Sequence, residues 1–176
     1  HAEFAILVHH HLAGRGFGRL LMEHAIAYAR ARGIRTITGD VRSHDIHSSI
    51  LNNDRKLWVF VPAGYEKDGA TRYPVLYMHE GQNLFDDATS YAGEWQADET
   101  ATRLIAEKKI SPIIIVGIEN NVQRGEEYTP TPFENAGGRG ADYARFVVEE
   151  VKPFVDRTYR TSPAREETGI GGSSLG

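Results

Sequence analysis

The chain of 176 residues has an apolar fraction of 40%, which fits one globular domain or one domain with part of another. Its formal net charge of −4 is mild and gives no reason to expect nucleic acid or an anionic membrane surface as a partner. The lack of cysteine excludes disulfide frameworks, thiolate zinc sites and cysteine nucleophiles, and no apolar run approaches the roughly 20 residues that span a bilayer.

The first part of the chain, residues 1–41, predicts a βαβ unit. Ala2–Val8 is an apolar run typical of a buried strand, and a glycine-rich loop follows it. Arg19–Arg32 has apolar residues at helical spacing, and Ile34–Val41 then alternates as a strand does. The pattern changes character near Val41–His47, so we place the second part at residues 43–176.

The second part predicts strands that alternate with helices, which indicates an α/β architecture with a largely parallel sheet. A polar, Gly- and Pro-rich segment interrupts the alternation at Glu119–Gly140, and loops of that length often carry function. The predicted strands are Leu57–Val61, Pro74–His79, Ile113–Ile118 and Thr168–Gly172, and the predicted helices are Ala97–Lys109 and Ala141–Tyr159, the latter bent or broken at Pro153.

The segment Gly172–Gly176 fits the pattern G-x-S-x-G directly after a predicted strand. In this motif the nucleophile lies on a sharp, strained turn, and small flanking residues avoid a collision of Cβ with backbone. The turn would raise the Ser174 hydroxyl above the carboxyl edge of the sheet. Ser174 is therefore the candidate nucleophile of an acyl-transfer enzyme.

Acyl transfer also needs hydrogen-bond donors for the oxyanion. The N–H of the residue after the nucleophile, Leu175, is one candidate. The second candidate lies in the segment that follows the strand at Pro74–His79, where Gly81 would let the Gln82 N–H point inward.

Together these motifs resemble the esterase family that includes enterochelin-esterase-like and S-formylglutathione-hydrolase-like proteins. The resemblance implies an α/β-hydrolase fold over residues 43–176, a small-molecule ester as substrate, no cofactor, and a Ser-His-Asp triad in which Ser174 is the nucleophile and Gln82 and Leu175 are the oxyanion donors. Glu80 stands where the family more often has Asp, and we expect little effect. The motifs that carry the resemblance are Trp58–Pro62, Tyr73–Asn83, Pro112–Gly117, Glu127–Pro130 and Gly172–Gly176.

The triad partners of this fold follow the nucleophile in the order Ser, acid, His, but all eight histidines of the chain precede Ser174. We therefore expect this sequence to form an incomplete hydrolase sheet that is nearly inactive as an esterase, because removing a triad member leaves about 10³–10⁴-fold acceleration. His79 could act as a substitute base, but a histidine at a strand end more often hydrogen-bonds backbone and shapes the loop. Tyr91 and Trp95 could line an acyl pocket, but aromatic residues near a helix start are more often core.

The loop in the first part, which contains Gly14, Arg15, Gly16 and Gly18, lies between a predicted strand and a predicted helix, where free N–H groups can bind a phosphate. Residues 1–41 resemble the middle of a GNAT N-acetyltransferase, which implies that these four residues would bind the pyrophosphate of acetyl-CoA. Ala13 departs from the Gln or Arg of that pattern. A dinucleotide loop and a plain βαβ turn are the alternatives. His9–His11 cannot all face one ion, so we expect no metal site.

Three functions therefore stay open: a serine carboxylesterase, an acetyl-CoA-dependent N-acyltransferase fragment, and a non-catalytic fusion product. The nucleophile strand would have an unpaired apolar edge, through which we expect self-association. A cysteine-free chain fits a cytoplasmic location. The sequence identifies neither the acyl group nor the alcohol of the ester.

Overall fold

The computed structural model describes residues 39–67, 69–91, 93–133 and 136–176. They fall within a compact unit that spans Thr38–Gly176, and the other unit of the chain, His1–Ile37, lies outside the described residues. The predictions for the glycine-rich loop at Gly14–Gly18 and for the three adjacent histidines therefore lie outside them too. Within the described part, no helix is both long and apolar enough to cross a membrane.

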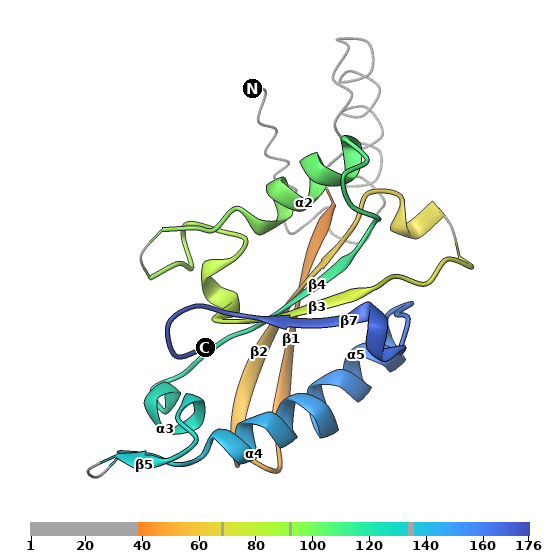
Figure 1. Cartoon of the computed structure of the whole chain (residues 1–176). Coiled ribbons are helices and arrows are strands. Elements are labelled where there is room, and N and C mark those ends of the chain that lie inside the picture. The colour runs from red at the N-terminus through yellow and green to blue at the C-terminus, as the bar shows by residue number, and fades with distance from the viewer. Residues whose placement is uncertain (1–38, 68, 92, 134–135) are drawn as a thin grey trace, which may run out of the picture. The chain divides into compact units, whose positions relative to one another are not determined.

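A five-stranded mixed sheet forms the centre of the described unit, in the order β1-β2-β4-β3-β7 (Figure 1). The pairs β1–β2 and β2–β4 are antiparallel, whereas β4–β3 and β3–β7 are parallel. The expected α/β class is confirmed, but a largely parallel sheet is not, because two of the pairings are antiparallel. The strands are β1 (Asp40–Ser48), β2 (Asn53–Val61), β3 (Val75–His79), β4 (Ile114–Ile118) and β7 (Thr168–Gly171), and a separate pair is β5 (Pro132–Phe133) with β6 (Ala136–Gly137).

Beyond Val41 the sequence does not predict strand β1, because the change of pattern at Val41–His47 indicates a boundary between the two parts. It pairs with β2 over its whole length, from Asp40 opposite Val61 to Ser48 opposite Asn53. Its less exposed positions include Arg42 and His44, so burial alternates along the strand while hydrophobicity does not. Polar residues at inward positions hide the period of two that identifies a strand.

Helices cover both faces of the sheet, as Figure 1 shows. On one face lies α2 (Ala97–Ala106), where Ala101 packs in a small cluster with Phe60 and Ile115. The other face carries the larger core, to which the segment after residue 139 contributes six buried residues, namely Tyr143, Phe146, Val147, Val151, Val155 and Tyr159. Strand β4 is buried along its entire length, as its apolar, β-branched run predicts.

The predicted helix Ala141–Tyr159 is present as three consecutive helical pieces. They are α4 (Gly140–Arg145), a π-helical segment (Phe146–Val151) and α5 (Lys152–Thr158). Pro153 lies in the first turn of α5, where its missing N–H breaks no bond within that helix. The π-helical segment ends at Val151, directly before the helix that contains Pro153. The chain therefore stays helical through the expected break.

Candidate active site

The Ser174 turn, which we define as Gly172–Gly176, follows β7 directly. Ser174 has a φ of 59°, in the left-handed region that residues other than glycine rarely adopt. A Cβ added to Gly172 would lie 2.3 Å from the Gly176 carbonyl carbon, so the two glycines face each other at close range. The local geometry is therefore the sharp, strained turn that the G-x-S-x-G spacing requires.

A second tight turn follows β3 at Glu80–Asn83. Glu80 is left-handed with a φ of 59°, and the Asn83 N–H closes the turn on the Glu80 carbonyl at 2.9 Å. A Cβ on Gly81 would lie 2.5 Å from the carbonyl carbon of Gly117 in β4, so the backbones of the turn and the strand touch. Only glycine fits at either position of this contact.

Both turns lie at the same edge of the sheet. Strands β3, β4 and β7 are parallel, so the chain leaves each of them on the side where ligands bind in open α/β sheets. Among the described residues, neither the Gln82 N–H nor the Leu175 N–H donates a hydrogen bond to the protein. The turn after β3 and the turn after β7 therefore each carry one free backbone N–H, that of Gln82 and that of Leu175.

His79, the last residue of β3, lies under the Ser174 turn. Its Nδ1 is 2.8 Å from the hydroxyl of Tyr143, and its ring is 5.4 Å from the rings of both Tyr143 and Tyr128. Burial lowers the pKa of His79, and the nearby Glu80 carboxylate offsets this only in part. The expected bond to backbone is replaced by a bond to a side-chain hydroxyl.

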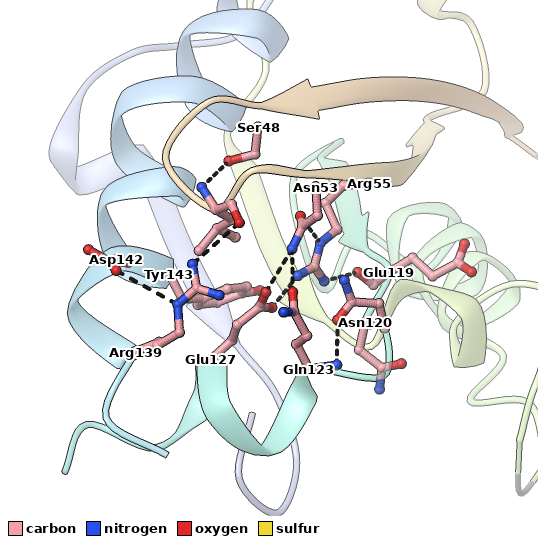
Figure 2. Close-up of polar contacts among 12 residues, drawn as sticks. Ser48, Asn53, Arg55, Glu119, Asn120, Gln123, Glu127, Arg139, Asp142 and Tyr143 are labelled. Atoms are coloured by element: carbon pink, nitrogen blue, oxygen red, sulfur yellow. Dashed lines mark hydrogen bonds and ion pairs between the residues drawn. The ribbon is translucent and has the colours of Figure 1, made fainter. Parts of the chain in front are cut away.

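The helix α3 (Arg124–Tyr128) is fixed to the sheet by a buried ion pair, shown in Figure 2. The side chains of Arg55 in β2 and Glu127 in α3 form a hydrogen-bonded ion pair and are 1% and 0% exposed. Asn53 Nδ2 donates to Glu127 at 3.0 Å and to Gln123 at 2.9 Å, while Arg55 Nε donates to Asn53 Oδ1 at 3.0 Å. Buried side chains of β2 therefore fix the position of α3 in the long segment after β4.

A second ion pair ties α3 to the turn at Glu80–Asn83. Arg124 Nε donates to a Glu80 carboxylate oxygen, and the Arg124 guanidinium lies 5.4 Å from the centroid of the Tyr128 ring. The Asn120 N–H also donates to the Gln82 side-chain carbonyl at 3.2 Å. The sequence identified Glu80 only as a departure from a pattern, and its link to Arg124 was missed because the two residues are far apart in the chain.

The segment between the Glu80–Asn83 turn and α2 differs from its prediction. Tyr91 is 93% exposed and Trp95 is 41% exposed, so the prediction that these aromatic side chains are core is wrong. Three carboxylates gather nearby, since oxygens of Glu94, Asp98 and Glu99 lie within 4.8 Å of one another. Burial, with the neighbouring Glu99, raises the pKa of Asp98 to about 7.

The parallel strands that end in a left-handed serine turn are the arrangement of the α/β-hydrolase class. The chain belongs to the esterase family described as "Putative esterase", whose model matches residues 48–176. A model of the acetyltransferase (GNAT) family matches residues 1–50. Each match falls on the part of the chain in which the sequence motifs indicated it.

The similar proteins include several esterases. An endo-1,4-beta-xylanase/feruloyl esterase of Xylanibacter ruminicola is 29% identical over 126 residues, which are 67% of this chain and 16% of that protein. The uncharacterized protein YjcH of Bacillus subtilis is 27% identical over 78% of this chain and 52% of its own length. The structure of an IroE-like serine hydrolase from Shewanella oneidensis aligns with a TM-score of 0.65 at 24% identity, over 78% of this chain and 43% of that one. This chain thus spans about half or less of the proteins it matches.

Proposed function

We propose that the second part of the chain serves ester hydrolysis, with Ser174 as the nucleophile and the Gln82 and Leu175 N–H groups as oxyanion donors. The observation that carries this proposal is the left-handed Ser174 turn at the carboxyl edge of β7. Membership of the esterase family supports the reaction class. The proposed ester is a small molecule, and the feruloyl esterase activity in a relative's name makes a feruloyl ester the first substrate to try.

In the proposed reaction, Ser174 Oγ attacks the ester carbonyl and loses its proton to a general base. The carbonyl oxygen becomes an oxyanion that the two N–H groups stabilise, and one such donor is worth about 10²–10³ in kcat. The C–O bond to the alcohol then breaks, the alcohol takes a proton, and water hydrolyses the acyl-enzyme. The nucleophile is a side-chain group and the two donors are peptide groups, and the proposed reaction uses no cofactor.

His79 is not the base in this proposal. His79 Nδ1 is already bonded to the Tyr143 hydroxyl at 2.8 Å, and the tautomer of the ring decides which group donates. Where Tyr143 donates to Nδ1, the proton of the neutral ring lies on Nε2, and neither ring nitrogen is then free to accept the Ser174 proton.

A fluorophosphonate probe tests the nucleophile directly, since it reacts with an activated serine. Because loss of a triad member leaves only about 10³–10⁴-fold acceleration, we expect slow labelling, with a single adduct that mass spectrometry locates on Ser174 and that Ser174→Ala abolishes. Ser173→Ala is the matched control, because it removes the neighbouring hydroxyl and should leave labelling intact. Labelling that persists in Ser174→Ala, or none in the wild-type chain, would refute the proposal.

A second candidate function concerns the first part of the chain. The GNAT match over residues 1–50 favours binding of acetyl-CoA, with Gly14, Arg15, Gly16 and Gly18 as the proposed contacts to its pyrophosphate. Saturable CoA binding should raise the melting temperature, and Gly16→Asp should remove that shift. A melt that CoA leaves unchanged at millimolar concentration would rule out this function.

We further propose self-association through the edge of β7. Within the described residues β7 pairs with β3 alone, and Ile170 at its centre is 61% exposed. Sedimentation should detect a dimer that Ile170→Lys weakens. A concentration-independent monomer would contradict this.

A further inference from the structure

The Ser174 turn has few hydrogen bonds to hold it in place. The ladder between β7 and β3 ends where Gly171 pairs with Met78. In the turn itself, the backbone bond found among described residues is the one from the Gly176 N–H to the Ser173 carbonyl at 3.0 Å. That bond closes the turn on itself and does not attach it to the rest of the protein. The position of Ser174 therefore depends on packing.

Two aromatic rings supply that packing. A Cβ added to Gly172 would lie 2.8 Å from His79 Cδ2, and one added to Gly176 would lie 2.9 Å from Tyr128 Cε2. Real Cβ contacts are hardly ever this short, so the backbone on each side of Ser174 lies directly on a ring. The two glycines are required by the fold of the turn and also by the rings below it.

Both rings are held by further contacts. Tyr143, which is buried, binds Nδ1 of His79 and stands edge-on to Tyr128, with ring centroids 4.8 Å apart. The Tyr128 atoms nearest the turn are ring carbons, since a Cβ added to Gly176 would lie 2.9 Å from Cε2 and 3.3 Å from Cδ2. The ring of Tyr128 therefore makes the contact that matters to the turn.

The helix that carries Tyr128, α3, is itself fixed by two ion pairs. Tyr128 is the last residue of α3, and its neighbour Glu127 forms the buried ion pair with Arg55 in β2. One turn earlier in the helix, Arg124 pairs with Glu80 at the end of β3. Helix α3 thus connects strand β2, the turn with the proposed oxyanion donor Gln82, and the Ser174 turn.

We propose that Tyr128 and His79 are positioning residues, whose rings form a shelf that sets the height and direction of the Ser174 turn. This inference rests on the proposed function for its catalytic meaning, because Ser174 is the residue that the shelf would position. The contacts themselves exist whatever Ser174 does. A change at Tyr128 that keeps the ring should be tolerated, and one that removes it should release the turn.

The test compares Tyr128→Phe with Tyr128→Leu in the full chain. Hydrogen exchange measured by mass spectrometry reports the mobility of residues 172–176, and the fluorophosphonate labelling rate reports the placement of Ser174. We expect Tyr128→Leu to speed exchange in 172–176 and to slow labelling about 10- to 100-fold, since a displacement near 1 Å can cost that much. Tyr128→Phe should match the wild-type chain in both measurements.

Tyr65→Leu is the control, since Tyr65 is a buried tyrosine of the same core that packs on Tyr73 and Tyr159 instead. It should lower the melting temperature and leave both measurements on the folded protein unchanged. Equal exchange of 172–176 in Tyr128→Leu and wild type would overturn the inference. So would a Phe variant as impaired as the Leu variant. If the wild-type chain does not label at all, the proposed function fails. Hydrogen exchange of residues 172–176 then remains as the test of whether the two rings hold the Ser174 turn.

Discussion

Two long segments leave the same edge of the sheet and are held in different ways. The described part of residues 119–139, after β4, is fixed mainly by side chains, above all by the buried pair of Arg55 and Glu127. The described part of residues 84–96, after β3, begins with the buried Leu84 and is then held by bonds to backbone, to the Asn83 amide and to the Asp86 carboxylate. The Trp95 N–H donates to the Asn83 carbonyl at 2.8 Å, and the Tyr91 N–H donates to Asn83 Oδ1 at 3.0 Å.

The difference suggests separate roles for the two segments, one of which supports the Ser174 turn while the other presents side chains to solvent. Buried side chains commit residues 119–139 to one geometry, and that geometry carries Tyr128 to the Ser174 turn. Residues 84–96 keep their backbone fixed while Tyr91 and Trp95 stay exposed to solvent. Because residues 84–96 are held largely through their backbone, the Tyr91 and Trp95 side chains can contact other molecules. In residues 119–139 the side chains that fix the segment are buried and cannot do so.

The largest effect should follow Glu127→Ala. This change leaves the Arg55 guanidinium buried without its partner, which typically costs about 3–5 kcal/mol. Chemical denaturation should measure the loss, and hydrogen exchange should rise in residues 119–139 before it rises in 84–96. A uniform rise in both segments would remove the distinction between them.

The double variant Arg55→Met with Glu127→Leu is the control for the charge itself. Replacing a buried pair by apolar side chains of similar size is often neutral or stabilising, so most of the lost stability should return. If the double variant is as unstable as Glu127→Ala, then shape at these positions matters more than charge.

Asn83→Ala should have a smaller and local effect. It removes the Oδ1 acceptor of the Tyr91 N–H but leaves the carbonyl that binds Trp95, so we expect a cost of about 1 kcal/mol. Exchange should rise in residues 84–91 and stay unchanged in 119–139. Asn121→Ala removes a comparable acceptor in the other segment, at 2.8 Å from the Gln123 N–H, and should give the reverse pattern.

The carboxylate at the start of α2 should make stability depend on pH. The pKa of Asp98 is about 7 in the folded protein against 3.8 ordinarily, so the folded state holds this proton more tightly than the unfolded state does. The stability contributed by Asp98 should therefore fall as pH rises from 4 to 7, because burial, together with Glu99 and Glu94, disfavours the ionised carboxyl. Asp98→Asn should melt higher than wild type at pH 8 and at a similar temperature at pH 4. A wild-type advantage at pH 8 would contradict this.

Tyr91→Ser should have the smallest effect on stability. The side chain is 93% exposed, so its loss should change the free energy of unfolding by no more than about 0.5 kcal/mol. Tyr128→Ser, on the other segment, should cost more than that. A large cost at Tyr91 would mean that its ring is covered in solution.

The local patterns in the sequence predicted the strands that end at the site, and the G-x-S-x-G spacing predicted a strained turn at Ser174. Strand β1 was missed, because Arg42 and His44 occupy positions where a strand pattern needs apolar residues. The pair of Arg55 and Glu127 joins residues 72 positions apart, so no local period indicates it. The shelf of rings was missed for the same reason, since periodicity does not report which distant side chains meet.

The contact between Gly81 and Gly117 limits which sequences this site can use. An added Cβ at Gly81 would meet the Gly117 backbone at 2.5 Å, and one at Gly117 would meet the Gly81 Cα at 2.8 Å. A clash between two side chains can be repaired by shrinking one of them, but here each new atom would strike a main chain. No second substitution in the pair can compensate for the first, so the two positions should show no reciprocal rescue in a double-mutant library. Other residues of the turn with Gln82 and of strand β4 can therefore vary, but neither glycine can be replaced.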